Sequence, residues 1–233
     1  MLHVHRTSDP ESAVAVAVSQ YLNKRAGTPT LLLIAGGSLP ATVLPHLDRQ
    51  ILTPDLTISI LDERCTTDDT GRNQLQLHAT PFYQEAQHAG VQTLEVLLTE
   101  TAVCPAVAAD WEARLRAWQK AAPSGEIVVL AGVGADGHIA GILCHSPAET
   151  PVFSGTEWIV AHHFTGIATP YPYRITPTFT FWQEAVTTSF VYLSGPEKAV
   201  ASQAIQVSTA DLAATPGAIL SQPSVGSVQL FID

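Results

Sequence analysis

The segment from Gly132 to His138 carries side chains that could do acid–base chemistry. It reads Gly-Val-Gly-Ala-Asp-Gly-His and follows a long apolar run. A neutral imidazole can take a proton from water near pH 7, and a neighbouring carboxylate can orient or polarise it. We therefore predict that Asp136 and His138 form a catalytic pair. Two alternatives remain: a histidine that only hydrogen-bonds its own loop, and a metal ligand, for which nearby cysteine and histidine pairs offer no recognised spacing.

The glycines of this segment also match the Gly-x-Gly-x-x-Gly pattern of dinucleotide-binding folds. That fold needs a full helix after the third glycine, followed by a strand that ends on an acidic residue. Here Pro147 and Pro151 would interrupt such a helix, and Glu157 begins the next apolar run instead of ending it. We therefore reject NAD binding and expect no cofactor.

Two further segments place small or charged residues directly after apolar runs. Gly36, Gly37 and Ser38 could hold a phosphate through backbone N–H groups and a hydroxyl, although a turn merely capped by Ser38 would look the same. Asp-Glu-Arg at 62–64 follows Thr-Ile-Ser-Ile-Leu. Charge at the end of a strand is tolerated where it serves a ligand or an ion pair, and the alternative is a solvated strand end.

The basic residues are few, which makes their positions informative. The chain has 11 Lys and Arg against 21 Asp and Glu, with a formal net charge of -10, so we expect no nucleic-acid partner. An acidic protein that binds an anion must concentrate its cations at the site. Lys198 follows Gly195-Pro196 in the first turn of a predicted helix, where it opposes the helix dipole, and Arg174 precedes a possible strand. Either could contact an anion, and a solvated lysine would also fit.

Apolar runs that alternate with helix-like segments must position these residues. Such runs predict an α/β fold with a doubly wound, mostly parallel sheet and helices on both faces. We expect strands at 30–35, 56–61, 126–131, 157–161, 189–194 and 228–232, and helices at 11–25, around 111–118 and at 196–207. No linker or repeat divides the chain, so we expect one domain over 1–233. Ligands bind such sheets beyond the carboxyl ends of the strands.

Composition sets the remaining expectations. With 46% hydrophobic and 14% charged residues, the chain has the composition of a compact globular protein. It shows neither a membrane-spanning run nor a signal peptide, so we expect a cytoplasmic protein with no membrane partner. The 3 cysteines share no Cys-x-x-Cys spacing, so we expect free thiols.

Taken in order, several motifs resemble those of the 6-phosphogluconolactonase family, within the wider glucosamine-6-phosphate isomerase/6-phosphogluconolactonase superfamily. Between residues 36 and 199 these are Gly-Gly-Ser-Leu-Pro, Asp-Glu-Arg, Asn73, Gly-Val-Gly-Ala-Asp-Gly-His, Arg-Ile-Thr and Gly-Pro-Glu-Lys-Ala. Asp-Glu-Arg resembles the lactonases, since the deaminases usually carry Asp-Glu-Tyr. Leu143 stands where the deaminases have a glutamate that assists ring opening. The chain departs from the lactonases at Cys65-Thr66-Thr67, which replaces Val-Pro, and at Ile142-Leu143-Cys144, which lacks a proline.

The resemblance implies a Rossmann-like hydrolase that converts 6-phospho-D-glucono-1,5-lactone to 6-phosphogluconate in the oxidative pentose phosphate pathway, without a metal. It implies His138 as general base, Asp136 as its partner and Arg64 as a contact for substrate or developing charge. The implied binding residues are Gly36, Gly37, Ser38, Asp62, Asn73, Arg174 and Lys198. We expect a monomer or small homo-oligomer. A deaminase-isomerase is one alternative. A non-catalytic phosphosugar sensor is another, although too few residues precede Gly36 for the DNA-binding segment that usually accompanies such sensors.

Overall fold

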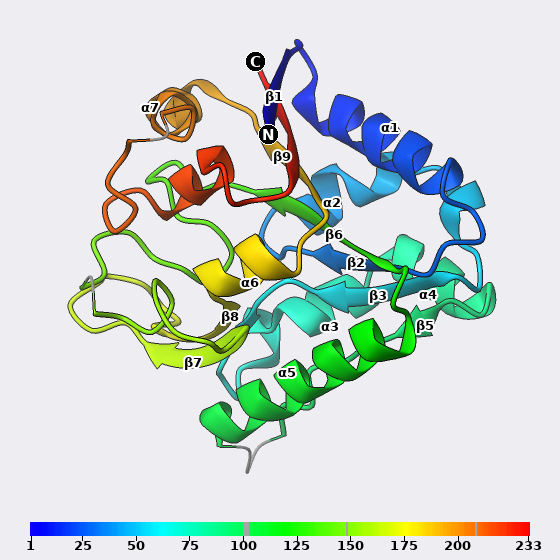
Figure 1. Ribbon diagram of the computed structural model, residues 1–233, viewed down its shortest axis with the longest axis horizontal. Helices are drawn as coiled ribbons and strands as arrows, with labels where there is room; N and C mark the ends of the chain where they lie inside the picture. The colour runs from blue at the N-terminus through cyan, green and yellow to red at the C-terminus, as the bar shows by residue number, and fades with distance from the viewer. Residues whose placement is uncertain (100–102, 148, 208) are drawn as a thin grey trace.

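Parallel strands form the main sheet of the computed structural model, which describes residues 1–99, 103–147, 149–207 and 209–233 (Figure 1). The sheet has seven strands, all parallel to their neighbours. In spatial order they are β1 (Leu2–Arg6), β10 (Ser227–Ile232), β9 (Thr188–Leu193), β6 (Glu126–Gly132), β2 (Thr30–Ile34), β3 (Leu56–Ile60) and β5 (Gln92–Thr93). Every residue of β2 and β3 is buried, as expected for strands covered on both faces.

A second, three-stranded antiparallel sheet contains β4 (Glu63–Arg64), β8 (Tyr173–Pro177) and β7 (Ile159–His163). The run at 157–161 was expected to join the parallel strands, and that expectation is wrong. Parallel neighbours need a crossover of a dozen or more residues, usually a helix, whereas residues 164–172 link β7 and β8 without one. The two strands therefore pair antiparallel.

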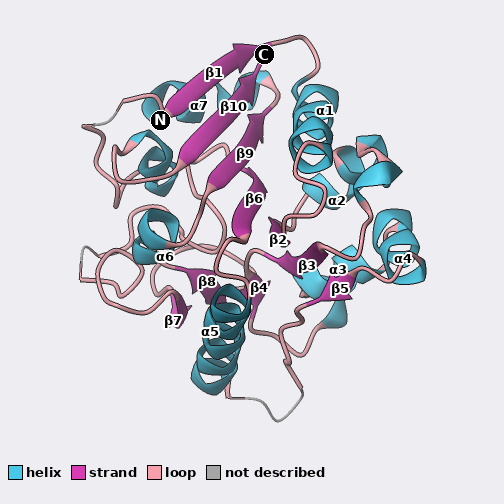
Figure 2. Cartoon of the chain, turned by 45° about the vertical axis from the view of Figure 1, so that its right-hand side comes forward, coloured by secondary structure: helices cyan, strands magenta, loops and turns pink. Residues whose placement is uncertain are grey.

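Helices lie on both sides of the main sheet, which confirms the predicted doubly wound α/β class. Figure 2 shows α1, α2 and α4 on one side and α6 and α7 on the other. The helices are α1 (Pro10–Asn23), α2 (Leu39–Thr42), α3 (Asn73–His78), α4 (Pro81–His88), α5 (Cys104–Ala121), α6 (Phe179–Glu184) and α7 (Ala199–Ala204). Short 3₁₀ segments are η1 (Leu44–His46), η2 (Arg49–Ile51), η3 (Asp69–Gly71), η4 (Pro196–Lys198) and η5 (Pro216–Ser221).

The predicted helices agree with the helices of the structure to different degrees. Helix α1 begins at Pro10, one residue before the expected start at 11, and the Asp9 carboxylate caps it by accepting a hydrogen bond from the Ser12 backbone N–H. Trp111 and Leu115 are fully buried on one face of α5. The helix expected at 196–207 is instead split into η4 and the short α7. Within the described residues, no helix combines the length and apolar character needed to cross a membrane.

The strand order reverses at the centre of the main sheet. From β2 the chain continues to β3 and β5 on one side, and it later places β6, β9 and β10 on the other, where the earlier strand β1 forms the edge. The loops after adjacent β2 and β6 therefore diverge and leave a crevice at their carboxyl ends, where open α/β sheets bind ligands. The segments after these strands contain Gly36 and Gly134, as the sequence analysis expected.

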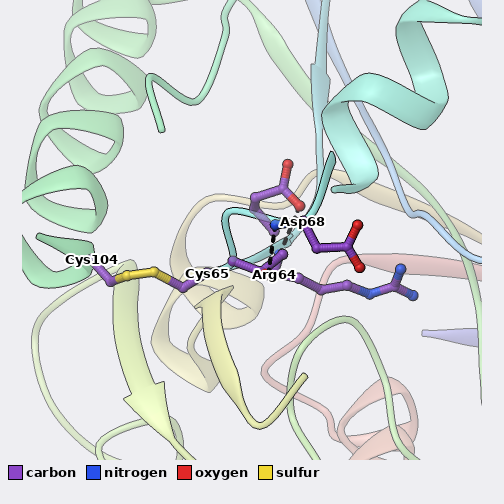
Figure 3. The surroundings of a disulfide bond; sticks show 6 residues. Arg64, Cys65, Asp68 and Cys104 are labelled. Carbon is purple, nitrogen blue, oxygen red and sulfur yellow. Dashed lines mark hydrogen bonds between the residues drawn. A yellow bond between two sulfur atoms is a disulfide. The ribbon is translucent and has the colours of Figure 1, made fainter. Parts of the chain in front are cut away.

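Two of the cysteines form a disulfide, which corrects the expectation of free thiols. Cys65, just after β4, is bonded to Cys104 at the start of α5 (Figure 3). Cys144 is free and buried. The bond joins residues separated by 39 positions in sequence, a spacing that matches no short cysteine motif. In the chain-entropy account, closing a loop of this length stabilises the folded state by about 4 kcal/mol.

Helix α3 begins where a buried carboxylate meets its N-terminus. Glu63 is 0% exposed, and its carboxylate accepts hydrogen bonds from the backbone N–H groups of Arg64 (2.7 Å), Asn73 (2.7 Å) and Gln74 (3.0 Å). Burial raises the pKa of Glu63, and the three N–H donors oppose that shift. These bonds satisfy donors that a helix start leaves without intrahelical partners. Glu63 thus fixes α3 against β4.

Glu63→Gln should destabilise the protein by about 1–3 kcal/mol, because it replaces an acceptor with an NH₂ group that faces a buried backbone N–H. Urea unfolding would measure the loss. Glu85→Gln is the matched control, since it changes an ion pair with Arg49 in which the glutamate side chain is 47% exposed. Equal stability of Glu63→Gln and the wild type would contradict the capping role.

Candidate active site

A cavity of about 390 Å³ lies beyond the carboxyl ends of β2 and β6. All of the site residues predicted from the sequence line it except Asp136. The lining predicted residues are Gly36, Gly37, Ser38, Asp62, Arg64, Asn73, His138, Arg174 and Lys198. The structure therefore brings together segments that are more than 160 positions apart in the chain.

Asp136 lies behind the imidazole of His138 and orients it. Its Oδ1 lies 2.6 Å from His138 Nδ1 and also accepts from the His138 backbone N–H at 3.1 Å. The side-chain hydrogen bond lowers the pKa of Asp136 to about 2, so this carboxylate is ionised at neutral pH. An ionised partner favours the proton on Nδ1, which leaves Nε2 as a proton acceptor. With 40% of its side chain exposed, His138 can act as a base toward a ligand in the cavity.

The glycines of this loop create the space for that pair. Gly134 N–H donates to the His138 carbonyl at 2.9 Å, which closes the turn. A Cβ at position 134 would overlap the His138 imidazole, and Gly137 has a φ of +97°, a conformation that favours glycine. Between 138 and 158 the described residues contain no helix, so the loop lacks the helix of a dinucleotide fingerprint.

Two arginines lie side by side on adjacent strands of the small sheet. Arg64 of β4 and Arg174 of β8 are directly paired in the antiparallel register, and both line the cavity. Like charges in directly opposite positions repel each other. Burial lowers the pKa of Arg174, and Asp62 opposes that shift. This cationic pair would be stabilised by an anion bound in the cavity.

Asp62 places a buried carboxyl group next to the arginines. It is 4% exposed, so the alternative of a solvated strand end is wrong. Burial raises the pKa of Asp62, while Arg174, Arg64 and His138 act in the opposite direction. In the folded protein its ionised form is therefore less favourable than in the unfolded chain.

Asn73 connects Asp62 to the glycine loop. Its Nδ2 donates to the Asp62 carbonyl at 2.9 Å and to the Asp62 carboxylate at 3.3 Å. Its Oδ1 is buried and has no hydrogen-bond partner among the described residues. A Cβ on Gly36 would overlap this amide, which explains the glycine there. Asn73 thus has an acceptor, next to the glycine loop, that no described residue satisfies.

The other wall of the cavity is organised by Tyr192, at the carboxyl end of β9. Its hydroxyl lies 3.0 Å from Ser38 Oγ and 3.2 Å from Thr42 Oγ1, and Lys198 Nζ lies 5.5 Å from the centre of its ring. The side chain of Ser38 makes no capping bond to α2, so its hydroxyl is not explained as a helix cap. Gly37, which precedes Ser38, has a φ of +73°, a backbone conformation that favours glycine.

Tyr192 and the segment from Thr169 to Tyr171 also line the cavity, although the sequence did not predict them as site residues. Tyr192 lies two residues before the end of the strand predicted at 189–194, so its place near the carboxyl edge of the sheet was a usable signal. Residues 169–171 lie in an irregular connection, where no periodicity predicts direction. No group of three or more His, Cys, Asp or Glu among the described residues is arranged to hold a metal ion.

Asp62→Asn should stabilise the protein relative to the wild type as pH rises. Because burial raises the folded pKa of Asp62, its protonated form stabilises the folded state at low pH, and this contribution is lost as pH rises through the raised pKa. Asparagine stays neutral, so the gap in unfolding free energy should widen from about pH 4, the usual pKa of aspartate, toward neutrality. Urea unfolding at several pH values would measure it. The exposed Asp69→Asn is the control, and a gap independent of pH would contradict the prediction.

Comparisons with known proteins agree with this architecture. The family model of glucosamine-6-phosphate isomerases/6-phosphogluconolactonase matches residues 9–229. A crystal structure of 6-phosphogluconolactonase from Leishmania guyanensis is 21% identical, with a TM-score of 0.76 over 100% of this chain and 96% of that chain. That of a 6-phosphogluconolactonase from Shewanella baltica OS155 is 19% identical, with a TM-score of 0.74 over 100% and 97%. No curated protein matches the sequence. The chain belongs to the glucosamine-6-phosphate isomerase/6-phosphogluconolactonase family.

Proposed function

We propose that this protein hydrolyses 6-phospho-D-glucono-1,5-lactone to 6-phosphogluconate, the second step of the oxidative pentose phosphate pathway. The observation that carries the proposal is a carboxylate-bound imidazole facing a cavity that also holds three cationic side chains. A base suits attack of water on an ester carbonyl, and cations suit an anionic substrate. The names of the structurally similar proteins support the same substrate.

The reaction begins at His138. Its Nε2 accepts a proton from water while Nδ1 stays hydrogen-bonded to the ionised Asp136. The resulting hydroxide bonds to the lactone carbonyl carbon, and the carbonyl oxygen gains the negative charge of a tetrahedral intermediate. When the bond from that carbon to the ring oxygen breaks, the protonated imidazole donates its proton to the departing oxygen. The product is the open-chain acid, and the neutral imidazole is regenerated.

The cations divide between the two ends of the substrate. Arg64 stabilises the developing oxyanion or holds the substrate beside it, and Arg174 adds a second positive charge on the same wall. The phosphate binds Gly36, Gly37, Ser38 and Lys198, where Tyr192 positions the serine hydroxyl and the lysine. Asp62 and Asn73 hold sugar hydroxyl groups between these ends.

One observation disfavours the deaminase alternative. Leu143, at the position where deaminases carry the glutamate that assists ring opening, is 6% exposed and packs in the hydrophobic core. An apolar, buried side chain can neither accept nor donate a proton. A sensor would bind the phosphosugar without turnover, so kinetics separates it from an enzyme.

His138→Ala should lower kcat for lactone hydrolysis by roughly 100- to 10,000-fold, because it removes the base. Acid release followed at constant pH would measure the rate, corrected for spontaneous opening of the lactone. His3→Ala, at an exposed position on β1, is the control. Wild-type rates equal to the spontaneous rate would overturn the function, and equal rates for His138→Ala and the wild type would overturn the mechanism. Ammonia release from glucosamine 6-phosphate would indicate the deaminase instead.

Lys198→Ala should raise KM for the phosphorylated lactone about tenfold and leave kcat nearly unchanged, since the lysine binds a group remote from the reacting carbon. Steady-state kinetics with glucono-1,5-lactone, which lacks the phosphate, should show no such change. Lys120→Ala, at the exposed end of α5, is the matched control. An equal effect of Lys198→Ala on both lactones would contradict the phosphate assignment.

A further inference from the structure

We propose that Tyr171 is a positioning residue for Arg64, which it holds in the orientation that the cavity requires. The proposal rests on the lactonase function for its kinetic consequences. Its structural basis is a set of contacts that join the connection between β7 and β8 to the loop after β4. Neither loop is held by the main sheet. The contacts between the two loops therefore determine the position of the cavity wall that they form.

Tyr171 is anchored at its hydroxyl. The phenol donates a 2.6 Å hydrogen bond to Asp68 Oδ2. The other carboxylate oxygen of Asp68 accepts from the backbone N–H of Thr70 (3.0 Å) and from its hydroxyl (2.7 Å), so the acceptor is itself fixed by its own turn. The shared hydrogen bond lowers the pKa of Asp68 and raises the pKa of Tyr171, which keeps the proton on the phenol.

The ring of Tyr171 then covers Arg64. The centre of the ring lies 5.3 Å from Arg64 Cζ, within the range of a cation–π contact. Below the ring, a Cβ on Gly71 would lie 2.5 Å from Tyr171 Cζ, so only glycine leaves room there. The Gly71 carbonyl accepts from Arg64 Nη1 at 2.9 Å. Figure 3 shows Arg64 next to Cys65, whose disulfide anchors the same loop to α5.

The guanidinium of Arg64 is thus held by a carbonyl and an aromatic face while some of its donors remain unused. Its Nε is buried without a partner among the described residues. Arg64 also lies opposite Arg174, which repels it, so an unsupported guanidinium would turn away from its neighbour. Thr169, two residues before Tyr171, lies at 3.5 Å from Arg174 Nη2 through its hydroxyl. One short segment therefore touches both arginines.

If Tyr171 acts through Arg64, its removal must matter only while Arg64 is present. Tyr171→Phe keeps the ring and should lower kcat/KM about threefold, because it breaks the anchor to Asp68. Tyr171→Ala should lower kcat/KM about 5- to 20-fold and divide the loss between kcat and KM as Arg64→Ala does. In an Arg64→Ala background, Tyr171→Ala should cause no further loss beyond about twofold.

The closing experiment is this double-mutant cycle, with Tyr173→Phe as the matched control because that phenol takes no part in the Asp68 contact. Circular dichroism checks that each variant is folded. An equal loss from Tyr171→Ala with and without Arg64 would overturn the proposal. Asp68→Ala also removes the hydrogen bonds from Thr70, so it should lower kcat/KM at least as much as Tyr171→Phe. Adding Tyr171→Phe to Asp68→Ala should cause no further loss, and additive losses would also overturn the proposal.

Binding measurements separate this proposal from the proposed function. Calorimetric titration with 6-phosphogluconate gives a dissociation constant that needs no turnover. If the wild type fails to hydrolyse the lactone, the lactonase function fails, and the same cycle in dissociation constants still tests Tyr171. Loss of coupling between Tyr171 and Arg64 in binding would then overturn the positioning role. Persistent coupling would support it for a different phosphosugar reaction.

Discussion

The arrangement of the site depends on one buried carboxylate. Glu63 accepts hydrogen bonds from three backbone N–H groups and so joins the start of β4 to the start of α3. Successive side chains of a strand point to opposite sides, so an inward Glu63 directs Asp62 and Arg64 to the cavity. The same bonds place Asn73 at the first position of α3, beside Gly36. A residue outside the cavity lining therefore determines where three lining residues lie.

The cavity brings together charged side chains whose arrangement is electrostatically unfavourable. Arg64 and Arg174 oppose each other, and burial raises the pKa of nearby Asp62. Such an arrangement is unfavourable without a ligand, and it persists because the surrounding sheets and the Glu63 cap hold it in place. An anionic substrate would relieve part of this cost when it binds. An anion bound between the two arginines would therefore reduce the repulsion between them.

Much of this site follows from sequence because parallel strands bring their carboxyl ends to one edge. The glycine loop near Gly36 and the turn that carries His138 were found in this way, as was the parallel sheet. Sequence could not show that the 157–161 run pairs antiparallel, since its partner is chosen by a connection without a helix. It could not pair Cys65 with Cys104, because contact between distant residues leaves no local pattern. Tyr171 was missed for the same reason: its direction depends on Asp68, about a hundred positions earlier.

The disulfide gives the chain a covalent ring. Residues 65 to 104 form a closed ring that contains η3, α3, α4 and β5, and with them Asn73 on the cavity wall and Asp68, the partner of Tyr171. A protease that cuts once inside this ring leaves both fragments attached through sulfur. The nicked wall therefore stays at high effective concentration beside the rest of the site. Only a second event, cleavage of the sulfur bridge, would let the two pieces diffuse apart as separate chains.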